Sequence, residues 1–83
     1  MTKGDEVRRL REAAGLTLEA VSEVAGITMG YLSLLERGLR PLSVDMFTAL
    51  AQSVQGLRDQ RDADYNAALV ETGFRPGAKV VPA

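Results

Sequence analysis

The chain has 83 residues, a length that favours a single small domain. Hydrophobic residues make up 46% of the sequence and charged residues 25%, a balance typical of a folded globular protein rather than of a disordered chain. There is no cysteine and no histidine, which excludes a disulfide framework and the usual ligands of zinc, and the formal net charge is −1.

The first helix is predicted over residues 5–14. Val7, Leu10 and Ala14 fall on one side of this segment, so we expect them to face the core. Gly15 is expected to end the helix. The arginines of the segment spread over its other sides. They are explained equally well as a solvated face near Glu12 and as contacts to phosphate.

The stretch LTLEAVSEVAGITMGYLSLLERGLR predicts two short helices joined by a tight turn. Thr17 is suited to cap the first helix, which is expected to end at Gly26, because glycine adopts the left-handed conformation that terminates a helix at little cost. Thr28 is suited to cap the second helix, expected from Met29 to about Arg37. This spacing is typical of DNA-binding proteins that place the second helix in the major groove.

Packing positions in these two helices follow the helical period. Val21 and Ala25 are expected to point inward from the first helix, and Leu32 and Leu35 from the second. Glu36 lies nearer the core side, and we expect it to have a structural role, paired one turn later with Arg40.

Six segments in order carry a resemblance to a known family: Leu10-Arg11, Gly15-Leu16-Thr17, Gly26-Ile27-Thr28, Tyr31-Leu32-Ser33, Glu36-Arg37-Gly38 and Arg40-Pro41-Leu42-Ser43. Together they resemble the Cro/lambda-repressor type of helix-turn-helix protein, the XRE family, over roughly residues 7–54. The resemblance implies an all-α fold, a compact five-helix domain with the helix-turn-helix at its second and third helices. It also implies double-stranded DNA as the partner.

The resemblance further implies roles for individual residues. Base edges would be read by Thr28, Met29, Gly30, Ser33 and Leu34. The DNA backbone would be contacted by Lys3, Arg8, Thr17, Leu18, Arg37 and Arg40. The chain departs from the family pattern at several of these positions, because Met29, Gly30 and Leu34 have no hydrogen-bonding side chain and Leu18 stands where glutamine is common.

Two explanations of this departure remain open. In the first, the helix still enters the groove and recognises thymine methyl groups and DNA shape through Met29 and Leu34. In the second, the apolar surface that these two residues form with Leu18 and Val24 binds a protein, such as another regulator or a toxin. We favour the first because the cations named above remain where the backbone contacts of the fold would lie.

Two further helices are expected. Ser43 is suited to cap a fourth helix, in which Leu50 and Val54 face the core and which is expected to end at Gly56. A fifth helix is expected over residues 57–71. Its stripe of Tyr65, Ala68, Leu69 and Thr72 would pack on the domain or on a second subunit.

The chain is therefore expected to divide into a helix-turn-helix core domain (1–56), an additional helix (57–72) and a tail or dimerisation arm (73–83). The dimer candidates are Tyr65, Leu69, Phe74, Val80 and Val81. Asp59, Asp62 and Asp64 suit a solvated helical face better than a calcium loop, because no glycine turn and no terminal glutamate follow at the right spacing.

We thus expect a DNA-binding transcriptional regulator, a repressor or Cro-like protein, acting as a homodimer on a palindromic operator. The alternative is a helix-turn-helix fold used to bind protein, as in an antirepressor or an antitoxin. No catalytic group, metal site or cofactor is expected, because the commonest general base is missing and no carboxylate pair marks a cleft. No apolar run approaches the ~20 residues that span a bilayer, and no signal peptide follows the charged N-terminus, which favours the cytoplasm.

Overall fold

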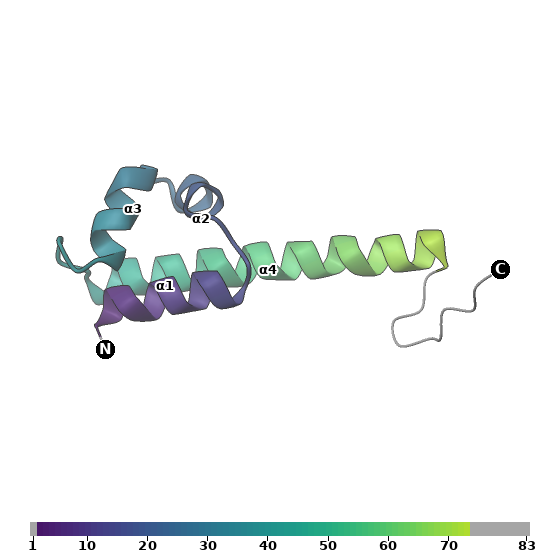
Figure 1. Ribbon diagram of the computed structural model, residues 1–83, viewed down its shortest axis with the longest axis horizontal. Coiled ribbons are helices and arrows are strands. Elements are labelled where there is room, and N and C mark those ends of the chain that lie inside the picture. The colour runs from purple at the N-terminus through teal and green to yellow at the C-terminus, as the bar shows by residue number, and fades with distance from the viewer. Residues whose placement is uncertain (1, 74–83) are drawn as a thin grey trace, which may run out of the picture.

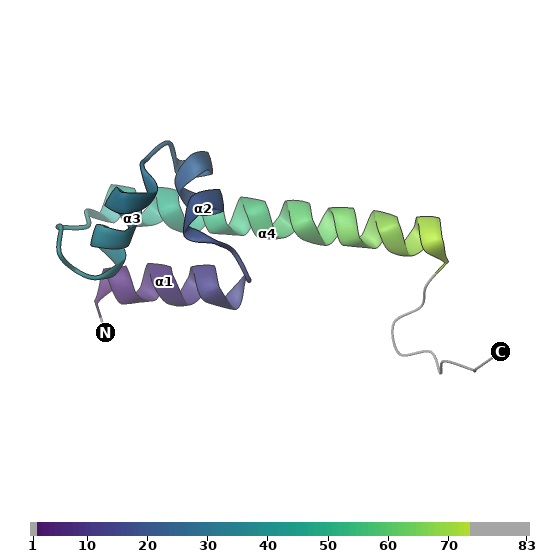
Figure 2. The ribbon, with the colours of Figure 1, turned by 45° about the horizontal axis from the view of Figure 1, so that its top comes forward.

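A computed structural model describes residues 2–73 of the chain. These residues form four helices and no strand: α1 (Lys3–Ala13), α2 (Leu18–Ala25), α3 (Met29–Glu36) and α4 (Val44–Thr72). α1 and α4 run side by side, and α2 and α3 pack against them from the same side (Figure 1; Figure 2). The all-helical prediction is confirmed for this part of the chain.

Each helix begins where a side chain accepts one of the amides that the first turn leaves free. Thr17, Thr28 and Ser43 each accept a hydrogen bond of 3.1 Å from the amide three residues later, so the three predicted caps are confirmed. α1 begins two residues earlier than predicted, because Thr2 and Asp5 form a reciprocal capping box. The hydrogen bond from the Thr2 amide also lowers the pKa of the Asp5 carboxyl.

The predicted fourth and fifth helices are one helix, α4, which passes through Gly56 without a break. The prediction of a break there, and with it of five helices, was wrong. A glycine inside a helix costs only about 0.5–1 kcal/mol relative to alanine, which packing easily offsets. Leu57 has no capping side chain with which to start a new helix, and it packs against the core instead. A hydrogen bond of 2.9 Å from Gln55 to Asp59 spans the glycine.

The core is formed by seven buried apolar residues drawn from all four helices and from the end of α1. All of them were predicted to face inward: Val7, Ala14, Val21, Leu32, Leu35, Leu50 and Val54. Leu10 was also predicted to face inward, but it is 44% exposed. The buried side of α1 also includes Gly4 and Arg11, which moves the centre of that side away from Leu10 and leaves it at the edge.

The last part of α4 extends beyond the rest of the domain (Figure 1). The Arg61 guanidinium donates a hydrogen bond to the carbonyl of Ala14, the residue that caps the C-terminal end of α1. From residue 62 to residue 73 only Leu69 is partly buried, and Tyr65 is 55% exposed, so this segment does not pack on its own domain. That a second subunit covers this segment remains a prediction. Three predicted dimer contacts, Phe74, Val80 and Val81, lie outside the described residues.

Within residues 2–73, no helix taken singly combines the length and the apolar composition needed to cross a bilayer. Only α2 and α3 counted together meet those two criteria, and they do so as a pair bent by 107°.

Gly56→Ala is expected to raise the free energy of unfolding by about 0.5–1 kcal/mol, because α4 is continuous at this point. A methyl group added there meets no atom within 4 Å. Chemical denaturation followed by circular dichroism measures the change. The control Gly26→Ala should change stability in the opposite direction. Because φ at this position is +74°, alanine is expected to lower the free energy of unfolding by about 1–2 kcal/mol. A loss of stability in Gly56→Ala would contradict an unbroken helix.

Candidate nucleic-acid interface

A three-residue turn, Gly26 to Thr28, joins α2 to α3 and changes the chain direction by 107°. Gly26 adopts the left-handed conformation, which lets the amide of Ile27 donate to the carbonyl of Ser22 at 3.0 Å and closes the end of α2. Ile27 packs against the core and anchors the turn. The geometry is that of a helix-turn-helix, as the spacing of the sequence predicts.

A buried ion pair fixes α3 to α1. The Nε and Nη2 atoms of Arg11 donate to the two carboxylate oxygens of Glu36 at 2.9 and 3.0 Å, and Nη1 donates to the carbonyl of Leu16 at 3.0 Å. The two side chains are only 12% and 4% exposed. The hydrogen bonds to Glu36 raise the pKa of Arg11, so its guanidinium stays charged. The predicted pairing of Glu36 with Arg40 was wrong, because Arg11 reaches the carboxylate from another helix.

Gly4 provides a second contact between α1 and α3. It is buried, and a Cβ atom at this position would collide with the backbone carbonyl of Leu35. The last turn of α3 therefore rests directly on the first turn of α1, at a distance that only glycine permits. Neither the role of Gly4 nor that of Arg11 was predicted from the sequence. A glycine near the start of a helix was the one available signal.

The predicted base-reading residues lie along the outer side of α3 and its N-cap. Thr28, Met29 and Gly30 are exposed, Met29 by 51% of its surface, whereas Ser33 and Leu34 are partly buried. Apart from its chain neighbours and the backbone of α3 itself, no described residue lies within 4 Å of the position that a Cβ atom at Gly30 would take. The beginning of α3 is therefore open to a large partner.

The predicted backbone-contacting residues form two groups beside the second half of α3. Arg8, Leu18 and Arg37 share a small hollow of about 180 Å³ with Ser33. Lys3 and Arg40 line another hollow, of about 230 Å³, between the start of α1 and the loop after α3. Thr17 lies apart from both groups, as the cap of α2.

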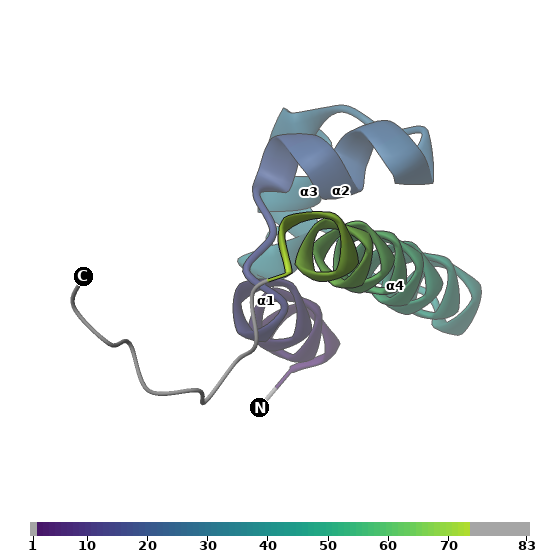
Figure 3. The same ribbon diagram turned by 90° about the vertical axis from the view of Figure 1, so that its right-hand side faces the viewer.

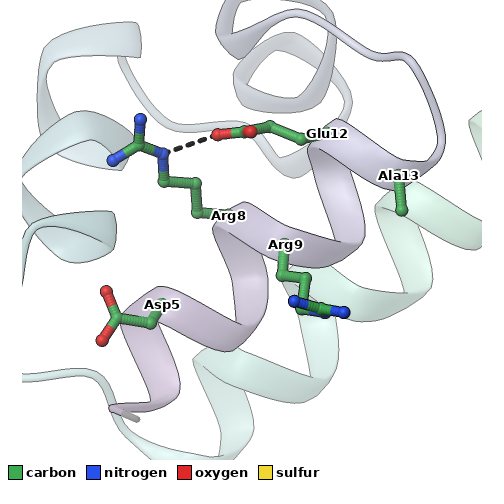
Figure 4. A pocket seen from close by; sticks show the side chains of 5 residues that line it. All are labelled: Asp5, Arg8, Arg9, Glu12 and Ala13. Atoms are coloured by element: carbon green, nitrogen blue, oxygen red, sulfur yellow. Dashed lines mark hydrogen bonds and ion pairs between the residues drawn. The ribbon is translucent and has the colours of Figure 1, made fainter.

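The cations differ in how readily they can meet a phosphate. The guanidinium of Arg8 is paired with Glu12 at 2.6 Å (Figure 4). This hydrogen bond raises the pKa of Arg8 and lowers that of Glu12. Arg37 and Arg40 are exposed and form no ion pair with any described residue. A phosphate would have to compete with Glu12 for Arg8. At Arg37 and Arg40 it would meet no competing carboxylate from the described residues.

No three acidic side chains in residues 2–73 come together in a way that would hold a metal ion. The three aspartates considered from the sequence, Asp59, Asp62 and Asp64, are all exposed along α4.

Comparison with known proteins identifies a matching family and two similar proteins. Residues 4–63 match a family described as a helix-turn-helix domain. The chain is 38% identical over 52 residues to the transcriptional regulator ClgR of Mycobacterium tuberculosis, a match that covers 63% of this chain and 46% of ClgR. It is 35% identical over 52 residues to the HTH-type transcriptional regulator Rv0474 of the same species, covering 63% and 37%. The match thus spans less than half of each relative. No solved structure matches.

Arg11→Met is expected to lower the free energy of unfolding by about 3–5 kcal/mol, because Glu36 then stays buried without a partner. The double variant Arg11→Met/Glu36→Leu removes both charges and is expected to recover most of this loss. Urea denaturation of the wild type, both single variants and the double variant gives the coupling energy. If the double variant were as unstable as Arg11→Met, the ion pair would not be what fixes α3.

Proposed function

Because this chain belongs to the helix-turn-helix domain family, we propose that it is a sequence-specific DNA-binding transcriptional regulator. The observation that carries the proposal is the exposed beginning of α3, at Met29 and Gly30, together with the exposed cations Arg37 and Arg40 that follow its other end. α3 lies in the major groove, and the protein acts as a repressor or Cro-like regulator by occupying its operator. The printed names of ClgR and Rv0474, both transcriptional regulators, support this function.

The base contacts in this proposal are mostly apolar. The exposed side chain of Met29 and the accessible part of Leu34 contact thymine methyl groups, and Thr28 and Ser33 supply hydroxyl groups for hydrogen bonds. Gly30 lets the helix backbone approach the base edges closely, because it presents no side chain. Discrimination then depends on methyl groups and on DNA shape more than on bidentate hydrogen bonds.

The contacts to the DNA backbone come mainly from cations near the C-terminal end of α3. Arg37 and Arg40 meet phosphates directly, and Arg8 and Lys3 contribute from α1. The net charge of −1 and the acidic residues Glu19 and Glu23 of α2 leave one subunit with weak affinity. A single module of this kind buries roughly 600–1,000 Å² on DNA. A homodimer on a palindrome, with half-sites ~34–36 Å apart or a multiple of that, overcomes this weakness.

A second candidate function is the binding of a protein, as in an antirepressor or an antitoxin. Val24 and Met29 are 56% and 51% exposed, and an apolar surface beside α3 suits another regulator or a toxin. A gel shift on random-sequence DNA at low salt separates the two functions, because a protein-binding module gives no shifted band.

Arg37→Ala and Arg40→Ala are each expected to weaken binding to all DNA sequences and to reduce the slope of log affinity against log salt by about 1. Fluorescence anisotropy on a single half-site, titrated at several salt concentrations, measures both quantities. Arg58→Ala removes the same charge from the middle of α4, away from α3, and on a single half-site it should change neither quantity. An unaltered slope in both test variants would place the phosphates elsewhere.

Gly30→Ala distinguishes a role in DNA contact from a role in folding. The added methyl group meets no atom within 4 Å and improves helix propensity, so stability should stay equal or rise by up to about 1 kcal/mol. Affinity for a selected operator should nevertheless fall by about tenfold, because the methyl group holds the helix away from the base edges. A variant that binds that operator as tightly as the wild type would argue against close approach at this position.

A further inference from the structure

An open apolar groove runs between α1 and α4. Its first part, a hollow of about 590 Å³, is lined by Leu10 and Ala13 of α1 and by Phe47 of α4. Its second part, of about 430 Å³, shares Leu10 and Ala13 and continues along α4 from Val54 to Asp62. Leu10, the residue wrongly expected in the core, is 44% exposed on this groove. No residue of α2 or α3 lines either part, so an occupant would leave α3 free.

The free end of α4, residues 62–73, is long enough to cover much of this groove. Its eleven helical residues, 62–72, extend about 16 Å, and the part of α4 that lines the groove, from Phe47 to Asp62, extends about 23 Å. Figure 1 shows that the free end has no other helix beside it, and Figure 3 looks along α4 from this end. The free end continues a helix that is already formed, but it gains almost no tertiary contacts on its own domain, and in proteins most helical stability comes from such packing. Covering its apolar side therefore stabilises it.

The apolar side of the free end faces the same way as the groove. At 100° per residue, Tyr65 is in line with Phe47, eighteen residues earlier, and lies about 20° from Arg58. Leu69 lies about 40° from Tyr65 on the same side. When two identical helices pack antiparallel about a two-fold axis, each presents the same side to the other. The free end of one copy is thereby presented to the groove of a second copy.

The charges of the two surfaces are complementary. The free end carries three acidic residues and no basic residue, a net charge of −3: Asp62, Asp64 and Glu71. The charged residues that line the groove are three arginines and two acids, a net charge of +1: Arg9, Arg58, Arg61, Glu6 and Asp62, the last of which also begins the free end. Arg58 and Arg61 lie 3.8 and 3.9 Å from Asp62 of their own chain, which is long for an ion pair. Because the pairs are also exposed to solvent, they are weak. A second copy therefore suits this groove better than an acid-free apolar helix.

We propose that two copies of this chain pair with their α4 helices antiparallel, the free end of each lying in the α1–α4 groove of the other. Tyr65 and Leu69 of one copy then cover Leu10, Phe47 and Val54 of its partner. The contact is isologous, as closed two-fold dimers require. The inference rests on the proposed function, and it deepens that function by naming the surface through which the homodimer forms.

Cysteine cross-linking tests the pairing, because the natural chain contains no cysteine. A Leu10→Cys protein mixed with a Leu69→Cys protein should form, under mild oxidation, a disulfide-linked dimer that contains one copy of each. Val70→Cys is the matched control: it is adjacent and 85% exposed but lies on another side of α4, and it should not link to Leu10→Cys. Efficient linking of Leu69→Cys to itself would indicate parallel helices and would overturn the proposal.

Sedimentation equilibrium and half-site binding, measured on the same full-length samples, separate this inference from the proposed function. The wild type should be dimeric, and Leu10→Asp should weaken dimerisation by about tenfold or more while Val70→Asp leaves it unchanged. A monomeric wild type that binds half-site DNA would sink the pairing and leave the proposed function standing. A dimer that cross-links as described but binds no DNA would support the pairing and refute the DNA-binding function.

Discussion

The structure depends on the buried ion pair between Arg11 and Glu36. This pair joins the last turn of α1 to the last turn of α3, and the same guanidinium donates to the carbonyl of Leu16 in the loop before α2. Two buried charges are stable only when both find their partners, so the pair is satisfied in one arrangement of these three segments. Gly4 strengthens this constraint, because it brings α1 into backbone contact with α3. Hydrophobic burial stabilises the domain, and this pair sets the direction of α3.

Because α3 is fixed at its C-terminal end, its N-terminal end is free to meet a partner. Leu32 and Leu35 are buried, whereas Met29 and Gly30 are exposed. Arg37 and Arg40, which form no ion pair with any described residue, follow the fixed end of α3, and the exposed Met29 lies at the free end. In a chain of net charge −1, the proposed phosphate contacts therefore depend on the distribution of charge more than on its total.

α4 serves two purposes along one continuous axis. Its first half contributes Leu50 and Val54 to the core, and its second half leaves the domain after Arg61. The helix continues through Gly56 because the cost of one glycine is small beside the packing of the residues around it. The groove beside the first half and the exposed side of the second half lie on the same side of the helix. This is the symmetry that a self-complementary contact needs.

The sequence by itself determined the features that are decided within a few residues. The caps at Thr17, Thr28 and Ser43, the turn at Gly26 and the seven buried core positions depend on local hydrogen bonds and helical period, and all were predicted. Of the α3 positions assigned through the family resemblance, Met29 and Gly30 are exposed, whereas Ser33 and Leu34 are partly buried. Only the tertiary structure decided that Arg11 pairs with Glu36, that Leu10 lies on a groove and that α4 passes through Gly56. These outcomes depend on which distant segments meet, and neither spacing nor propensity along one chain specifies such contacts.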